Sequence, residues 1–376
     1  MGWLSGWDKR IKLTVDHADI DADVSHFPVT VFLSSTHGDC VFDELTSDAN
    51  RTKIAFTKSD GTTQMYGEIE KWDDANEVAI IHVSITGWSI SSSADTDFYL
   101  YYDSTHAANT TYIGDIDSTP GHSVWDSNFK FVCHMADATT STVKDSTSNG
   151  NDGTKGSANN PIEAVGKIGS AQDFDGGDYI TVADSVSLDQ TYITVEAIVS
   201  FDNTIASEQS IFSRDNVSDR CWQFRMERVP QKVGFIPFNT SGTPGIMYGD
   251  TGMSANTFYY VVGNWDGTNI RIYLDGSADG TPVAFSGTLQ TSSAAAYIGR
   301  RSSDDYWFGV IDEVRYSGNA RSAAWIAATY DSLWDTLLTY GSEEAEGWTG
   351  KAMGVTNPAK IMGVAVADIK KVMGVE

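Results

Sequence analysis

Residues 295–326 read AAYIGRRSSDDYWFGVIDEVRYSGNARSAAWI. Two runs in this stretch, AAYIG and GVIDEVRYS, place apolar residues at alternate positions on either side of a polar loop, a pattern that predicts half-buried strands. In the following RSAAWIAATYDSL, the apolar residues can share one face of a helix: Trp325, Ile326, Ala328 and Leu333. The stretch therefore predicts the last strands of a β-sheet domain, followed by one helix.

The chain before this stretch reads as short strands joined by polar turns. The turns WDGTN and LDGSADGT carry Asp-Gly pairs, which are typical of β-hairpins. An earlier block of short strands runs from RIKLTV to DFYLYY, and a polar segment with the composition of a linker separates the two blocks. The predicted fold class is all-β, with two β-sandwiches in tandem. The predicted boundaries are 1–104 for the first sandwich, 105–126 for the linker, 127–335 for the second sandwich and 336–376 for a tail.

The composition excludes several classes of function. The 376 residues carry a formal net charge of −26 without a cluster of Lys and Arg, so nucleic-acid binding is not expected. The same acidity opposes adsorption to anionic membranes, and no apolar run reaches membrane-spanning length, so membrane insertion is not expected. The amino terminus lacks a signal-peptide pattern, from which we expect release into the cytosol. Cys40, Cys133 and Cys221 are predicted to be buried or half-buried thiols.

Four phrases of the second block follow one another in a characteristic order: VKDSTSNGNDGT, GKIGSAQDFDGGDYITV, WDGTNIRIYLDG and the stretch quoted above. In order and spacing they resemble the concanavalin A-like, laminin-G-like lectin superfamily across about 130–330. The resemblance implies that the second sandwich is a jelly roll, in which two curved sheets pack face to face. The first block, from WDKRIKLTV to DFYLYYDS, resembles an uncharacterised β-sandwich family of phage and bacterial surface proteins.

The tail contains a short repeat. Met-Gly-Val follows a lysine three times, within 351–355, 360–364 and 371–375, which is similar to Gly-Val repeats at the ends of viral structural proteins. Four apolar residues near the end can share one side of a helix: Val366, Ile369, Val372 and Met373. So short a segment cannot bury this surface alone, and we therefore predict that the tail serves assembly or attachment. The resemblance to virion proteins favours a homotrimer.

Hydrolysis of glycans is not expected. Glucanases of the superfamily need two carboxylates that flank the scissile bond, placed a few residues apart on one strand. The candidate strand TVEAIVSF offers Glu196 alone, and RMERVP supplies Glu227 without a partner. The sequence therefore predicts a protein that is not an enzyme.

A structural calcium ion is the cofactor that the resemblance implies. In the superfamily such an ion commonly joins the first strand of the jelly roll to the last, and the matching candidate ligands are Asp137, Gly176 and Asp312. Asp145 and Asn151 are substitutes on the first-strand side. The alternative is that Asp312 caps a turn or pairs with Arg315.

A glycan site would combine aromatic faces with polar groups. The candidate ligand-binding residues are Trp222, Trp265, Tyr306 and Trp307. The competing interpretation places most of these rings in the core, as is usual in sandwiches. His134 lies on an apolar strand and is interpreted as a core residue, and Asp304 with Asp305 as a solvated loop.

These features together predict a virion structural protein, such as a tail, fibre or capsid-surface component, assembled in a host cytoplasm. Its partners would be other virion proteins, its own copies and a host-surface glycan displayed to the lectin-like domain. The alternative is a bacterial surface or secreted glycan-binding protein, which would be extracellular or attached to the cell surface.

Overall fold

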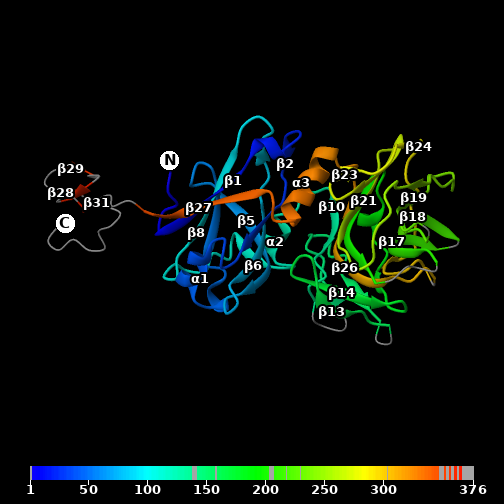
Figure 1. The fold of residues 1–376 in the computed structure, drawn as a ribbon, viewed down its shortest axis with the longest axis horizontal. Coiled ribbons are helices and arrows are strands. Elements are labelled where there is room, and N and C mark those ends of the chain that lie inside the picture. Colours follow the sequence, from blue (N-terminus) through cyan, green and yellow to red (C-terminus); the bar gives the residue numbers. More distant parts are fainter. Residues whose placement is uncertain are drawn as a thin grey trace.

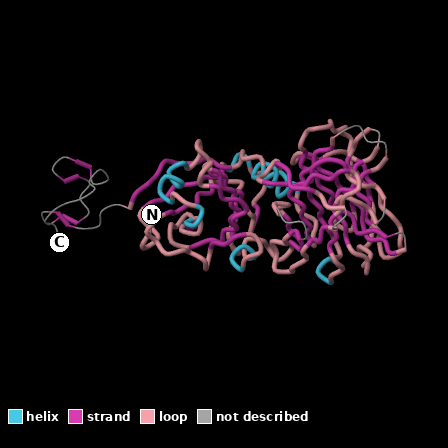
Figure 2. Tube along the Cα trace, turned by 90° about the horizontal axis from the view of Figure 1, so that it is seen from below, coloured by secondary structure: helices cyan, strands magenta, loops and turns pink. Residues whose placement is uncertain are grey.

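The computed structural model describes residues 2–346 apart from 138–141, 157–158, 203–206, 217, 229 and 303, together with four two-residue strands between 351 and 365. Strands dominate both bodies of the chain in the trace of Figure 2, and helices are few and short. The predicted all-β class is confirmed, with two sandwiches of which the second is a jelly roll. In the described part of the chain, no helix is long and apolar enough to span a membrane.

The first body, called here the amino-terminal sandwich, is built on one long sheet that folds around an apolar core. In sheet order its strands are β27 (Leu338–Ala345), β1 (Lys9–Val15), β8 (Thr96–Tyr102), β4 (Ile54–Lys58), β5 (Gln64–Asp73), β6 (Val78–Ser84) and β3 (Val29–Leu33). β9 (Ile113–Asp115) pairs with β5 in parallel, and β2 (Val24–Ser25) pairs with β7 (Ser89–Ile90). β5 pairs with both halves of the sheet, and its register shifts between Ile69 and Lys71. The apolar residues that alternate along these strands, such as Leu13, Val31 and Phe56, fill the space between the two halves.

The second body is the jelly roll, made of two antiparallel sheets. The interface sheet has the order β13 (Ile162–Val165), β14 (Ser170–Asp175), β26 (Phe308–Ser317), β16 (Ile193–Phe201), β21 (Tyr259–Trp265), β22 (Asn269–Leu274) and β23 (Ser277–Ala278), with β10 (Phe129–Cys133) on β26 and β24 (Val283–Ala284) on β22. The outer sheet has the order β11 (Thr142–Val143), β12 (Gly153–Lys155), β15 (Ile180–Val182), β25 (Ala296–Ile298), β17 (Gln209–Asn216), β18 (Asp219–Met226), β19 (Val233–Pro237) and β20 (Met247–Tyr248). One apolar core separates the two sheets.

Two of the predicted boundaries do not match the observed structure. Residues 338–345 were placed in the tail, but they return to the amino-terminal sandwich as the edge strand β27, visible in orange across the blue strands of Figure 1. Residues 105–126 were expected to be a linker, yet they form β9 and the helix α2 (Thr119–His122), and Trp125 is buried. Polar composition misled the prediction because these backbone groups are paired within the fold rather than solvated.

The helix predicted after the last strand is present as α3 (Ala323–Leu333), capped by the Ser322 side chain. It lies between the two bodies in Figure 1 and is buried on more than one side. Trp325 and Ala328 belong to the core of the amino-terminal sandwich, whereas Ile326 and Leu333 pack with Ile198 of the jelly roll. The two sandwiches are therefore joined through a shared apolar contact.

Several smaller elements complete the chain. The helix α1 (Asp39–Leu45), which the sequence analysis missed, and three 3-10 turns, His17–Asp19, Asp48–Asn50 and Val186–Leu188, lie between strands. In the tail, β28 (Lys351–Ala352) pairs with β29 (Val355–Thr356), and β30 (Lys360–Ile361) with β31 (Val364–Ala365). The helical face predicted for residues 366–373 lies outside the described residues. Cys133 and Cys221 are buried and Cys40 is half-buried, all three as free thiols, which confirms the prediction.

Candidate functional site

Three of the four aromatic residues predicted to bind a glycan lie in the core of the jelly roll. Trp222 is 1% exposed, and Trp265 and Trp307 are 0% exposed. The Trp222 ring stacks on Tyr316 at a centroid distance of 5.5 Å, and the Trp265 indole N–H donates to the Phe285 carbonyl at 2.9 Å. These three assignments are therefore wrong, because a ring enclosed by core side chains cannot offer its face to a sugar. Tyr306 is half-buried and remains accessible.

The three predicted calcium ligands do not meet. Gly176 follows Asp175, which pairs with Phe308, and Asp312 lies four residues further along β26, which separates the two by about 13 Å. Asp312 is 0% exposed, and its Oδ2 accepts the Ile168 backbone N–H at 3.0 Å. Asp137 Oδ2 accepts the Lys144 backbone N–H at 3.1 Å. This ligand set is therefore wrong, while calcium binding elsewhere on the chain stays a prediction.

The two substitute ligands have structural roles. Asp145 accepts backbone N–H groups from Val132, Thr147 and Asn151 at 2.8 to 3.1 Å, and the Thr147 hydroxyl at 2.9 Å. Asn151 donates to the Lys130 carbonyl at 2.6 Å. Both side chains hold the loop 145–151 against β10, and both oxygens of the Asp145 carboxylate have protein donors.

Glu196 is also buried. It lies on β16 of the interface sheet, is 1% exposed, and its Oε2 accepts the Tyr260 hydroxyl at 2.6 Å. Burial raises its pKa. A substrate in solvent has no access to this carboxyl group.

The interface between the two bodies contains a cluster of buried ionisable groups that the sequence analysis did not predict. His82 and Glu70 come from the neighbouring strands β6 and β5 of the amino-terminal sandwich, and His134 and Glu313 from the jelly roll. The two imidazole rings stack at 4.5 Å with an interplanar angle of 16°. His82 Nε2 lies 2.9 Å from Glu70 Oε2, and His134 Nδ1 lies 2.6 Å from Glu313 Oε1. We call these four side chains the interface cluster.

Local backbone geometry aims Glu313 at this cluster. β26 is irregular here, since its pairing with β16 shifts between Glu196 and Ile198, and Glu313 has a φ of 49°. A residue other than glycine in this left-handed region costs about 1–3 kcal/mol and is retained when surrounding structure fixes it. The adjacent side chains of Asp312 and Glu313 are both buried as a result.

Burial and neighbouring charges shift the pKa values of the cluster residues, in some cases in opposite directions. Burial and the Glu313 carboxylate raise the pKa of Glu70 to about 8, and burial together with the charge of His134 lowers the pKa of His82 to about 3. Burial alone would raise the pKa of Glu313, but His134 and Arg315 hold it well below its usual range. Burial alone would lower the pKa of His134, yet Glu313 raises it well above its usual value. His134 was interpreted as a satisfied core residue; it is buried, but its Nε2 has no hydrogen-bond partner.

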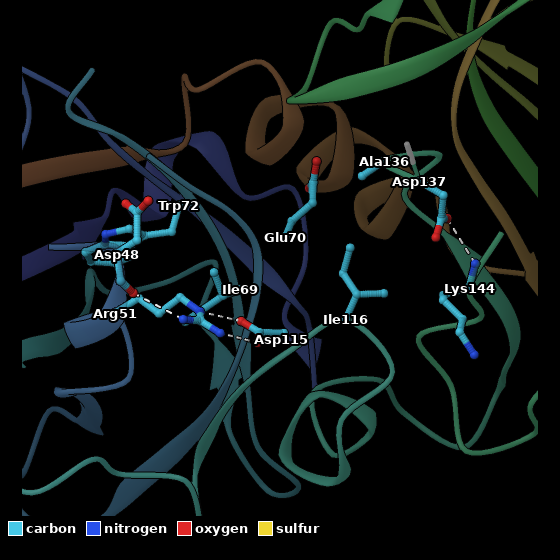
Figure 3. Close-up of a pocket in the computed structure, with 10 residues that line it drawn as sticks. All are labelled: Asp48, Arg51, Ile69, Glu70, Trp72, Asp115, Ile116, Ala136, Asp137 and Lys144. Carbon is cyan, nitrogen blue, oxygen red and sulfur yellow. Dashed lines mark hydrogen bonds and ion pairs between the residues drawn. The ribbon is translucent and has the colours of Figure 1, made fainter. Parts of the chain in front are cut away.

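A cavity of about 410 Å³ opens between the two bodies beside this cluster (Figure 3). Its lining includes Glu70 together with Asp48 and Asp115 of the amino-terminal sandwich, and Asp137 and Lys144 of the jelly roll. Polar groups from both bodies thus surround this cavity, and Glu70 borders it although its side chain is buried.

The outer sheet carries a second group of polar and aromatic side chains on the face that points away from the core. Ala296 and Ile298 of β25 are in the core, so Tyr297 between them faces outward. The Arg300 guanidinium lies 3.4 Å from the ring centroid of Tyr179 and 4.3 Å from that of Tyr297. Arg300 Nη1 is 3.4 Å from the Tyr306 hydroxyl, and no carboxylate within the described ranges forms an ion pair with Arg300. We call Tyr179, Tyr297, Arg300 and Tyr306 the outer patch.

A pocket of about 280 Å³ lies on the outer sheet as well. Asp215, Arg220, Arg301 and Ser302 line it. Arg220 holds Asp215 through two hydrogen bonds of 2.9 and 3.0 Å, and Arg301 pairs with Asp304. Asp304 is exposed as expected for a solvated loop, whereas Asp305 is half-buried and pairs with Arg301 at 3.3 Å.

Comparison with known proteins agrees with this architecture. Residues 174–327 match the family model described as the concanavalin A-like lectin/glucanases superfamily. The jelly roll is a concanavalin A-like domain. No curated protein sequence matches the chain.

Solved structures similar to this chain are distant. The binding domain of Paraclostridial mosquitocidal protein 1 aligns with a TM-score of 0.47 and 10% identity, over 55% of this chain and 52% of that one. Domain 4 of AbnA, an arabinanase from Geobacillus stearothermophilus solved with arabinotriose, aligns at 0.43 and 18% identity, over 56% of this chain and 98% of that domain. The botulinum neurotoxin serotype G binding domain aligns at 0.43 and 13% identity, over 54% and 50%. The chain therefore spans about half the length of the first of these structures.

Proposed function

We propose that the chain is a non-enzymatic structural protein of a virion, and that its concanavalin A-like domain binds a host-surface glycan through the outer sheet. The position of the amino-terminal sandwich supports the choice of the outer sheet as the binding face. This sandwich covers the central part of the interface sheet through α3 and the residues around Ile198 and Tyr260, and it lies on the side of the jelly roll away from the outer sheet (Figure 1).

The outer patch has the chemistry that sugars require. Half-buried tyrosine rings offer apolar faces to C–H groups, and the Arg300 guanidinium offers N–H donors to hydroxyl or carboxylate oxygens. Arg300 forms no ion pair within the described part of the chain; its Nε is buried and its Nη1 donates to the Tyr306 hydroxyl, so we expect a ligand to contact the rest of the guanidinium. The neighbouring pocket beside Arg301 adds further polar groups.

The absence of enzymatic activity is supported by the state of the carboxylates. Glu196 is enclosed, and on the outer sheet Asp215 and Glu227 are each engaged by an arginine, Arg220 and Arg225. Glycoside hydrolysis needs two carboxyl groups free to flank one bond. We therefore expect no release of reducing sugar from glucans or related polymers.

The location on a virion is supported by the resemblance of the first block to phage surface proteins and by the lysine and Met-Gly-Val repeats of the tail. Association into a homotrimer and contact with other virion proteins belong to this proposal. Imaging of assembled particles with an antibody against the concanavalin A-like domain tests it. Label on a bacterial cell surface, and none on particles, would favour a bacterial adhesion protein instead.

Glycan binding is tested on an array of neutral and acidic glycans. The wild-type protein should bind a subset of the glycans, and Tyr297→Ala and Arg300→Ala should each weaken that binding at least roughly tenfold. Arg271→Ala is the matched control, because Arg271 pairs with Asp266 and lies on β22 of the interface sheet, whereas Tyr297 lies on the outer sheet. Binding that persists in both outer-patch variants would place the ligand elsewhere.

A further inference from the structure

The interface cluster brings two imidazoles and two carboxylates to one point. One ligand atom each from Glu70, His82, His134 and Glu313 can be chosen so that all four lie within 4.8 Å of one another, and all four residues are buried. Ligands that surround a tetrahedral ion at about 2 Å are roughly 3.3 Å apart. Three of the separations here are 2.6, 2.9 and 3.5 Å, which bracket that value.

The atoms of the two histidines that point away from the common point lie near polar groups of other residues, as is usual for metal ligands. His82 Nδ1 lies 3.1 Å from the Thr30 hydroxyl, which leaves Nε2 directed at the cluster. His134 Nε2 lies 3.6 Å from Glu68 Oε2, and Glu68 Oε2 accepts the Trp125 indole N–H at 2.5 Å. A hydrogen bond such as the one between His82 and Thr30 orients a histidine ring and fixes its tautomer in metal centres, whereas Glu68 lies beyond hydrogen-bond distance of His134.

Glu313 is oriented in the same manner. Its Oε2 accepts two N–H groups of Arg315, at 3.1 and 2.5 Å, and its Oε1 faces the cluster. His82 and Glu313 thus each have one atom directed at the common point and another that is hydrogen-bonded to a second residue, whereas His134 directs Nδ1 at the common point and its Nε2 lies 3.6 Å from Glu68.

Some buried polar atoms in and beside the cluster have no partner among the described residues. Glu68 Oε1, Glu70 Oε1 and His134 Nε2 are buried without a hydrogen-bond partner. A buried polar atom without a partner costs about 1–3 kcal/mol, so an ion that binds the Glu70 carboxylate would offset part of this cost.

We propose that Glu70, His82, His134 and Glu313 bind one divalent transition-metal ion of the Zn²⁺ class, which links the two sandwiches. Imidazole and carboxylate together suit such an ion, whereas Ca²⁺ and Mg²⁺ take oxygen ligands almost alone. Since each body supplies two ligands, the ion stabilises the arrangement of one sandwich on the other. This site is separate from the outer patch and does not depend on glycan binding.

The cavity of Figure 3 borders the proposed site. Glu70 belongs to both the cavity lining and the interface cluster, and Asp48, Asp115 and Asp137 line the cavity together with Arg51 and Lys144.

The test measures metal in the full-length protein. Protein made in zinc-supplemented medium and passed through a desalting column should retain about one Zn²⁺ per chain by mass spectrometry of the elements. Replacement by Co²⁺ should give visible absorption typical of a four-coordinate ion. Glu70→Gln and His82→Gln should each lose the bound metal, and Thr30→Val, which removes only the partner of His82, should weaken binding by about 10–100-fold.

Two matched variants distinguish binding at the interface cluster from binding elsewhere on the chain. Glu196→Gln changes a buried acid of the same interface that is not a proposed ligand, and should keep the metal. In the described residues, the other set of side chains that could hold an ion is exposed and consists of Asp16, His17 and Asp95. His17→Ala removes one ligand from this set, and the variant should also keep the metal. Circular dichroism identifies any variant that fails to fold, in which case the metal content of the wild type and of Thr30→Val decides. Metal-free wild-type protein, or metal lost only in His17→Ala, would overturn the proposal.

Discussion

Arg321 donates two hydrogen bonds of 2.7 Å to Asp126, one to each carboxylate oxygen. Asp126 lies between α2 and β10, and Arg321 lies just before α3. The guanidinium also lies 4.4 Å from the ring centroid of Phe129 and 4.1 Å from that of Trp325. A planar, two-point ion pair between aromatic rings thus fixes the start of the jelly roll to its final helix.

Asp126→Asn should destabilise the protein by about 3 kcal/mol, because it leaves the buried Arg321 without its counter-charge. Burial alone would raise the pKa of Asp126, but Arg321 lowers it below the ordinary value of 3.8. A carboxylate with a lowered pKa stabilises the folded state above its unfolded pKa, and this contribution disappears as the pH falls through the folded pKa. Urea unfolding should therefore show a large difference between wild type and Asp126→Asn at pH 7 that shrinks below about pH 4. An equal difference at both pH values would contradict the assignment.

Trp222→Ala should cost about 3–5 kcal/mol of stability, because a large ring is removed from a closed core. Tyr306→Ala, at the half-buried edge of the outer patch, should change stability by less than about 1 kcal/mol. Thermal unfolding of the two variants distinguishes the core residue from the surface residue. If Trp222→Ala were as stable as the wild type and had lost glycan binding, Trp222 would be a glycan-binding residue after all.

A pair of truncations tests the boundary of the amino-terminal sandwich. A chain that ends after Glu346 keeps β27 and should melt like the wild type. A chain that ends after Thr336 loses the buried Leu337 and one of the two strands that pair with β1, and should melt several degrees lower and aggregate through the exposed edge of β1. Equal melting temperatures would show that β27 contributes nothing to this sheet.

The first truncation also tests the predicted role of the repeat tail. If the repeats mediate assembly, light scattering of the chain that ends after Glu346 should show smaller oligomers than the full-length protein. Unchanged oligomers with unchanged incorporation into particles would make the tail dispensable for assembly.

Calcium should not stabilise the protein through Asp312. An ion bound only by the folded state would add about 2.7 kcal/mol at a concentration one hundredfold above its dissociation constant. Because Asp312 is enclosed and already accepts the Ile168 N–H, any rise in melting temperature with calcium should be the same in wild type and in Asp312→Asn. A rise that the substitution abolishes would reinstate Asp312 as a ligand.

The sequence by itself determined the class of fold and the type of each domain. Alternation of apolar residues in stretches such as KLTV and GVIDEV, with Asp-Gly turns between strands, predicts sandwiches because a half-buried strand repeats every two residues. It also predicted α3 and the buried thiols. These features follow from local patterns and from composition, which the sequence displays directly.

Only the tertiary structure decided where the polar groups meet. Glu70 and Glu313 are 243 residues apart in the numbering, and nothing in EIEKW or IDEVR indicates that the two carboxylates face one another across an interface. In the same way, β27 pairs with β1 from the opposite end of the chain, and Trp222 enters the core rather than the surface. Strand patterns specify which residues share a face, but the packing of one sandwich on the other determines which faces are buried together, and that arrangement depends on contacts between residues distant in the chain.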